Sequence, residues 1–154
     1  MALPKLKAAC ALVISPSDDR KVLAVSRRED PTRFGLPGGK NDVGETVKQA
    51  CQRELKEETG LLLNSHATTL LYEGICRHPV TGQRYDTSTF VVRKWSGNVV
   101  RGDEGRVEWV TWKTLYAGPF GEYNRAVHAA YKEFLALESD GKKYVFVPGS
   151  TSAG

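Results

Sequence analysis

A helix with one mixed face is the feature that most constrains how this chain folds. Thr46 and Gln49 have the spacing of a capping box, which begins a helix, and a glycine directly after Thr59 is a good residue to end one. The segment between them, VKQACQRELKEET, contains neither proline nor glycine. The local signals therefore predict a helix over residues 46–59.

One face of this helix changes from apolar to acidic along its length. At about 100° per residue, a single stripe holds Val47, Ala50, Cys51, Glu54 and Glu58, with Glu57 at its edge. The opposite face is polar and holds Lys48, Gln49, Gln52, Lys56 and Thr59. The stripe that should pack on the core therefore ends in three carboxylates.

Three carboxylates this close together need a positive partner. Glu54 and Glu58 are a like-charge i,i+4 pair, which costs roughly 0.2–0.5 kcal/mol in an isolated helix. One interpretation is a solvated face paired with lysines, but the opposite face already provides a solvated surface. Arg53 offsets only part of the charge, so we expect a divalent cation with oxygen ligands beside this helix.

The bulk composition is that of one globular domain. The chain has 154 residues, of which 40% are hydrophobic and 26% charged, and we expect a single domain over 1–154, with a core at about 5–138 and a C-terminal extension at 139–154. No apolar run reaches the roughly 18 residues of a membrane span. We therefore expect no association with a membrane.

The cysteines and the net charge indicate the redox compartment and the class of binding partner. Cys10, Cys51 and Cys76 lie in apolar patterns without metal-ligand spacing, so we expect reduced core residues in a cytoplasmic protein. The net charge of +4 permits an anionic substrate. Stable nucleic-acid binding is not expected, because there is no arginine-rich tail or basic-aromatic stripe. Monomer and homodimer both stay open.

Strand-like segments lie on both sides of the predicted helix. They cover 8–15, 21–27, 68–77, 85–95 and 107–112, and a short last strand is expected over 142–148. The segments 68–77 and 85–95 have the pattern of a hairpin. A second amphipathic helix is expected over 122–137, with Val127, Ala130, Tyr131, Phe134 and Leu135 on its inner face. This order of elements predicts an α+β or α/β sandwich.

The run GKNDVGETVKQACQRELKEETGL resembles the Nudix box, G-x5-E-x7-R-E-U-x-E-E-x-G-U, where U is a bulky aliphatic residue. All nine fixed positions match: Gly39, Glu45, Arg53, Glu54, Leu55, Glu57, Glu58, Gly60 and Leu61. The resemblance implies an α+β fold, with a mixed sheet between helices in an α/β/α sandwich. It also implies hydrolysis, with Mg²⁺ or Mn²⁺, of a nucleoside diphosphate linked to another group, X.

The resemblance also assigns roles to the acidic helix. Glu57 and Glu58 match the main metal ligands, and Glu54 matches a ligand or, in some members, the general base. The carbonyl of Gly39 matches a backbone ligand of the metal. Arg53 is expected to orient the carboxylates.

Two stretches outside the box resemble the MutT-type subgroup, which hydrolyses (deoxy)nucleoside triphosphates, including oxidised guanine nucleotides. They are FGLPGGK before the box and GDEGRVEWVTW after it. In this subgroup a glutamate in a turn ahead of an E-W strand reaches the metals. Glu104 takes that place and Glu108 matches the E-W glutamate. Glu104 is thus a metal ligand and a rival to Glu54 as the base, or else a turn residue in solvent.

Three more residues are expected at the substrate. Asn124 falls where the subgroup places an asparagine against the base edge, and an amide that donates and accepts suits a purine. Its alternative is a helix cap. Gly38, beside Gly39, allows a close backbone approach, and Lys40, like Arg27, is a candidate to contact phosphate.

The expected reaction is therefore Mg²⁺-dependent cleavage of a (deoxy)nucleoside triphosphate to the monophosphate and pyrophosphate, with 8-oxo-dGTP among the candidates. ADP-ribose, a dinucleoside polyphosphate and an RNA 5′ end are the alternative substrates within the same chemistry. A catalytically dead nucleotide-binding regulator is the alternative of another class. The presence of every box carboxylate argues against it.

Overall fold

A four-stranded mixed sheet forms the centre of the computed structural model, which describes residues 6–100 and 105–146. Its strand order is β4-β1-β7-β6, with the bounds Gly38–Lys40, Lys7–Leu12, Arg84–Val92 and Thr68–Arg77. Strand β1 runs parallel to β7, whereas the other two pairs are antiparallel. The predicted hairpin is therefore present as β6 and β7, and the predicted mixed sheet is confirmed.

Two smaller sheets extend this centre. One has the order β3-β2-β9, with the bounds Phe34–Gly35, Lys21–Ser26 and Val107–Thr111, and the other pairs β5 (Leu62–Leu63) with β8 (Trp95–Ser96). The first is joined to β1 by the bridge between Ile14 and Val22 and by the Leu23 amide, which donates to the Val13 carbonyl at 2.9 Å. The chain thus passes from one sheet directly into the next.

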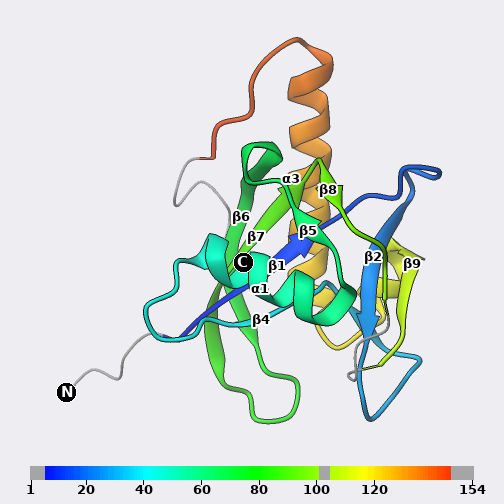
Figure 1. Cartoon of the computed structure of the whole chain (residues 1–154), viewed down its shortest axis with the longest axis vertical. Coiled ribbons are helices and arrows are strands. Elements are labelled where there is room, and N and C mark those ends of the chain that lie inside the picture. The colour runs from blue at the N-terminus through cyan, green and yellow to red at the C-terminus, as the bar shows by residue number, and fades with distance from the viewer. Residues whose placement is uncertain (1–5, 101–104, 147–154) are drawn as a thin grey trace.

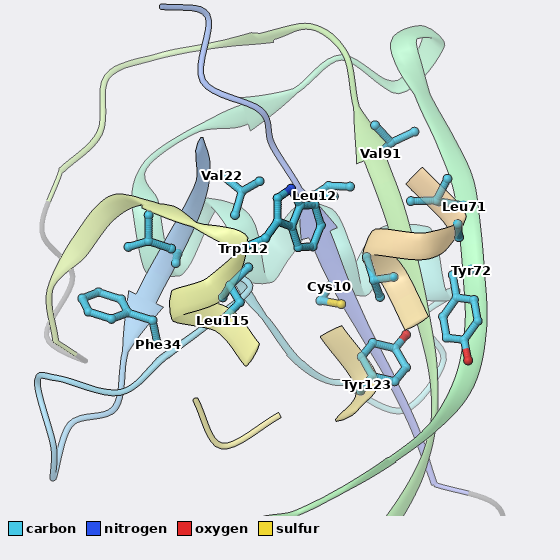
Figure 2. Packing of buried hydrophobic residues seen from close by; sticks show 14 of the residues in the cluster. Cys10, Leu12, Val22, Phe34, Leu71, Tyr72, Val91, Trp112, Leu115 and Tyr123 are labelled. Carbon is cyan, nitrogen blue, oxygen red and sulfur yellow. The ribbon is translucent and has the colours of Figure 1, made fainter. Parts of the chain in front are cut away.

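Helices cover both faces of the central sheet. Figure 1 shows α1 (Val47–Thr59) on one side and α3 (Gly121–Ser139) on the other. Alternation along β1 explains the two layers, because successive side chains of a strand point to opposite faces. Cys10 and Leu12 join the core cluster that includes residues of α3 and of α2 (Trp112–Tyr116) (Figure 2), while Ala9, Ala11 and Val13 join the cluster under α1. The α/β/α sandwich is confirmed.

The predicted boundaries of α1 are confirmed by its caps. The Thr46 hydroxyl accepts from the Gln49 amide at 3.1 Å, and the Gln49 side chain accepts from the Thr46 amide at 2.9 Å. Gly60 ends the helix in the left-handed region, at φ 83°. Thr59 differs from its predicted place on the polar face. Thr59 is fully buried instead. Its hydroxyl can leave solvent because it donates to the Leu55 carbonyl at 2.6 Å and accepts from the Leu61 amide at 3.1 Å.

Helix α3 runs one residue earlier and two residues later than predicted. Val127, Ala130 and Phe134 are buried and Tyr131 is half-buried, but Leu135 is exposed, so its place on the inner face was wrong. The predicted last strand is also wrong over 142–146, where no strand forms. Tyr144 instead anchors this segment, because its hydroxyl donates to the Leu71 carbonyl at 2.7 Å. A short 3₁₀ turn, Ser65–Ala67, precedes β6.

Membrane insertion through a helix finds no support in this fold. Within residues 6–100 and 105–146, every helix is too short or too polar to cross a bilayer.

Candidate active site

Strand β4 lies against the acidic half of α1. Gly38 can pair with β1 only without a side chain, because a Cβ there would lie 2.4 Å from the Ala9 carbonyl oxygen and 2.5 Å from the Cys10 Cβ. A Cβ on Gly39 would lie 2.6 Å from Glu54 Oε1. The two glycines therefore serve different contacts: Gly38 fits the sheet, and Gly39 leaves room for a carboxylate.

Glu58 is tied to the same strand. The Gly38 amide donates to Glu58 Oε2 at 3.1 Å, and the contact is partly shielded from solvent. Two of the three predicted carboxylates, Glu54 and Glu58, thus lie against the backbone of β4. Glu57 is different, since its side chain is 58% exposed.

The guanidinium of Arg53 is the cationic centre of this cluster. It binds the Glu45 carboxylate at 2.8 and 3.0 Å, and it binds Glu54 at 2.8 Å and Glu57 at 3.2 Å. It also donates to the Lys40 carbonyl at 2.9 Å, which links α1 to β4. This geometry fits the orienting part expected of Arg53.

The charges in this cluster stabilise one another. Hydrogen bonding to Arg53 lowers the pKa of the Glu45 carboxyl below its ordinary value of 4.5, with help from the Asp42 amide. Hydrogen bonding to Glu45 raises the pKa of Arg53 above its already high value. Both groups stay ionised at neutral pH, so Arg53 remains available to the other carboxylates.

The donors gathered here suit a hard divalent cation in kind. Glu54, Glu57 and Glu58 supply carboxylate oxygens and Gly39 supplies a carbonyl, the ligand type that Mg²⁺ prefers. The absence of a side chain at Gly39 is also consistent with a metal site, because any larger residue would displace the Glu54 carboxylate. In the described ranges, however, no three acidic, histidine or cysteine side chains surround one point, and Glu54 and Glu57 face Arg53 instead.

A cavity of about 450 Å³ opens beside this cluster. Glu58, Gly38, Gly39, Lys40 and Asn124 all line it. The structure thus brings together the predicted substrate residues and two of the predicted metal ligands, Gly39 and Glu58. The carboxylates of Glu54 and Glu57 are not part of the cavity wall.

Asn124 is the most informative residue of this wall. It is 2% exposed, and its Nδ2 atom has no hydrogen-bond partner among the described residues. A helix cap is not its function, because α3 begins at Gly121 with Phe120 as the capping residue. A buried amide donor without a partner costs about 1–3 kcal/mol, and Asn124 is the residue of this wall whose hydrogen bonding is incomplete among the described residues.

The two glutamates predicted after the box, Glu104 and Glu108, have different outcomes. Glu104 lies outside the described residues, so its predicted role stays a prediction. Glu108 lies on β9, where its carboxylate binds the guanidinium of Arg106, and it does not line the cavity.

Several wall residues were missed by the sequence reasoning. Phe120, Tyr85, Arg28 and Arg77 all line the cavity. Phe120 packs so closely on Gly35 that a Cβ there would lie 3.0 Å from its ring. None of these residues belongs to a spaced motif. The only available signal was that each lies near the end of a predicted strand or helix.

Arg27 lines the same cavity but already has an acidic partner. It binds Glu29 at 2.7 and 2.9 Å, and its guanidinium lies 6.0 Å from the centre of the Phe120 ring. The Lys40 ammonium lies 5.9 Å from the Tyr85 ring centre. Both cations therefore stand beside aromatic rings at the cavity wall.

Known proteins are similar to this chain in sequence and in fold. The NUDIX domain model matches residues 4–131. An 8-oxo-dGTP diphosphatase of Haemophilus influenzae is 36% identical over 102 residues, which cover 64% of this chain and 70% of that protein. An ADP-ribose pyrophosphatase of Methanocaldococcus jannaschii is 33% identical over 90 residues, or 57% of this chain and 52% of that protein. This chain thus matches about half the length of that relative.

A solved structure agrees with these sequence matches. The crystal structure of a MutT NUDIX hydrolase from Burkholderia pseudomallei has a TM-score of 0.59 and 27% identity, and the match covers 72% of this chain and 86% of that one. The family model extends over most of the chain and includes the acidic helix, β4 and the start of α3. With the box complete and the sandwich in place, this chain belongs to the Nudix family.

Proposed function

We propose that this protein hydrolyses a (deoxy)nucleoside triphosphate between the α and β phosphates, giving the monophosphate and pyrophosphate with the help of Mg²⁺ or Mn²⁺. The observation that carries the proposal is that Asn124, in the wall of a cavity that also reaches Glu58, has no partner for its Nδ2 within residues 6–100 and 105–146. A base at Asn124 and phosphates at the acidic helix would occupy both ends of one site. The name of the Haemophilus relative, an 8-oxo-dGTP diphosphatase, supports this substrate class.

The metal would be held by Glu57, Glu58, Glu54 and the carbonyl of Gly39. When bound, a divalent ion neutralises charge on the phosphoryl oxygens and makes water a better nucleophile. Arg53 binds both Glu54 and the Lys40 carbonyl, and so would keep the Glu54 carboxylate beside β4. Lys40, in the cavity wall, would stabilise negative charge on the phosphates.

The base is read by Asn124 in this proposal. Its Nδ2 donates to an acceptor on the edge of a purine, and the side-chain oxygen accepts from a neighbouring donor. Phe120, one helical turn before Asn124, supplies an aromatic surface in the same cavity. Loss of the amide should therefore weaken base discrimination and leave metal binding intact.

A panel of substrates tests this proposal. The rates of formation of all nucleotide products, the monophosphate above all, are compared for the four deoxynucleoside triphosphates, 8-oxo-dGTP, ADP-ribose and a dinucleoside tetraphosphate. We expect a purine triphosphate to have the highest kcat/KM. Asn124→Ala should reduce the preference among bases by about 1–3 kcal/mol, or about fivefold to 150-fold. An unchanged preference would remove Asn124 from base recognition.

ADP-ribose is the second candidate, because the Methanocaldococcus relative is named for that activity. It shares the pyrophosphate bond and therefore the acidic helix. An ADP-ribose rate ten times that of every triphosphate would replace the substrate proposed here but keep the metal-dependent chemistry.

The general base is either Glu54 or Glu104, and a pair of variants separates them. If Glu104 takes the proton from water, Glu104→Gln should lower kcat at least ~100-fold with little change in KM. A change of only a few-fold would leave Glu54 as the base. Glu108→Gln is the matched control, because Glu108 is bound to Arg106 and does not line the cavity.

A further inference from the structure

The first turn of α3 is held in place without a helix cap. Phe120, the capping residue, makes no side-chain hydrogen bond to the helix, and Gly121, the first helical residue, is a poor helix former. The position of this turn therefore comes from its contacts with the rest of the fold, where α3 packs on both β6 and α2. Asn124 belongs to this turn, since its backbone N–H donates to the Phe120 carbonyl at 2.9 Å.

One buried chain of hydrogen bonds supplies such a contact. The Tyr123 hydroxyl donates to the Thr87 carbonyl at 3.2 Å and lies 2.8 Å from the Thr89 hydroxyl, which lies 2.9 Å from the Cys10 thiol. The chain joins α3 to β7 and β1 across the core. Cys10 and Tyr123 are both labelled in the buried cluster of Figure 2.

The direction of each hydrogen bond in this buried series follows from the Thr87 carbonyl at its end, which can only accept. Tyr123 has one proton and gives it to a carbonyl, so the Thr89 hydroxyl donates to Tyr123 and the Cys10 thiol donates to Thr89. Burial raises the pKa of Cys10 to about 12 and raises that of Tyr123 well above 10. Both groups keep their protons at neutral pH, and the chain is neutral and fixed in direction.

The next residue along the helix depends on this anchor. Asn124 is buried, yet its Nδ2 has no protein partner among the residues that the structure describes. Its own Nδ2 therefore does nothing to hold the amide in one direction. That direction is set by the backbone at 123–124, which the Tyr123 hydroxyl holds against the sheet.

We propose that Tyr123 is a positioning residue for base recognition: its hydroxyl fixes the first turn of α3 and so sets the direction in which Asn124 presents its amide to the base. This inference rests on the proposed function, because it needs Asn124 to read the base. Tyr123 also lines the cavity, but its hydroxyl is engaged with Thr87 and Thr89, so the inference assigns it an effect on selectivity through the position of Asn124. Thr89 is a second positioning residue, since its hydroxyl on β7 is hydrogen-bonded to the Tyr123 hydroxyl.

The test compares base discrimination in variants that lose one hydroxyl each. Tyr123→Phe should lower the ratio of kcat/KM between the best and the worst purine triphosphate by about twofold to tenfold, the range to which one buried hydrogen bond converts. The kcat for the best substrate should stay within about twofold, because the acidic helix is untouched. Thr89→Val should act in the same direction, and Thr89→Ser should restore the ratio.

Tyr144→Phe is the matched control. This variant also removes a hydroxyl that donates to a carbonyl of the sheet, that of Leu71 at 2.7 Å. Tyr144, however, follows the C-terminal end of α3, whereas Tyr123 lies in its first turn. We expect it to lower the melting temperature by an amount similar to Tyr123→Phe and to leave the discrimination ratio unchanged. A drop in the ratio equal to that of Tyr123→Phe would tie selectivity to general stability and overturn the proposal.

Asn124→Ala separates failure of this inference from failure of the proposed function. If Asn124→Ala lowers the ratio and Tyr123→Phe does not, the positioning role is wrong and base reading by Asn124 stands. If neither variant changes the ratio, base reading by Asn124 is itself wrong, and the inference falls with it.

Discussion

Arg53 shows how one residue determines the state of several others. Its guanidinium holds the carboxylates of Glu45, Glu54 and Glu57 at 2.8 to 3.2 Å. Like charges on one helix face are tolerated because this cation lies among them, and because Glu58 has a separate partner in the Gly38 amide. Because each carboxylate has different partners, its substitution should change the free energy of unfolding by a different amount. Comparing this change with the change in turnover separates structural from catalytic contributions.

Glu58→Gln should stop catalysis without unfolding the protein. The amide oxygen of glutamine can still accept from the Gly38 amide, so the free energy of unfolding in EDTA should change by less than about 0.5 kcal/mol. Mg²⁺-dependent turnover should fall by more than the ~10- to 100-fold typical of changes around a metal site. Thermal unfolding and a turnover assay measure the two effects. A marked loss of stability in EDTA would make Glu58 a structural residue.

Glu45→Gln should change how stability depends on pH. The pKa of Glu45 is lowered in the folded state, first by its hydrogen bond to Arg53, from an ordinary value of 4.5. Its contribution to stability is therefore complete above that value and is lost as the pH falls through the lower, folded pKa. In urea unfolding in EDTA between pH 7 and pH 3, the variant should lose less stability than the parent. Parallel pH curves would contradict the ion pair.

At the scale of elements, local signals predicted α1 far better than they predicted β4. The capping box at Thr46 and the left-handed Gly60 are chemical signals within the segment itself. Strand β4 has three residues, two of them glycine, and it exists because β1 pairs with it from a distant part of the sequence. The predicted last strand is wrong over its described part, 142–146, for the converse reason: its apolar residues have the pattern of a strand, but no neighbouring strand pairs with them there.

Gly38→Ala and Gly39→Ala should fail in different ways. At Gly38 the new Cβ would meet the Ala9 carbonyl and the Cys10 Cβ, which the sheet holds in place, so we expect a loss of about 1–3 kcal/mol in the free energy of unfolding. At Gly39 it would meet the Glu54 carboxylate, which can turn away.

Gly39→Ala should consequently lose Mg²⁺-dependent turnover at a smaller cost in stability than Gly38→Ala. Urea unfolding and turnover are measured on both variants and on the parent. Equal losses of stability at the two positions would show that Gly39 serves the sheet rather than the carboxylate.

At the scale of the whole molecule, the cavity is a product of the fold rather than of the motif. Its wall takes Lys40 from β4, Glu58 from α1, Tyr85 from β7 and Asn124 from α3. The acidic helix was predictable because its charges lie within one segment at helical spacing. The aromatic wall at Tyr85 and Phe120, and the anchor at Tyr123, were not, because their roles arise only when distant segments are packed together.

The central claim is that this fold hydrolyses the bond between the α and β phosphates of a nucleotide through a metal held by the acidic helix. The most direct measurement is phosphorus NMR of the products formed from a purine deoxynucleoside triphosphate with Mg²⁺, and again after EDTA treatment. We expect nucleoside monophosphate and pyrophosphate in equal amounts with Mg²⁺, and no turnover in EDTA. Orthophosphate and the nucleoside diphosphate as products, or undiminished turnover in metal-free protein, would contradict it.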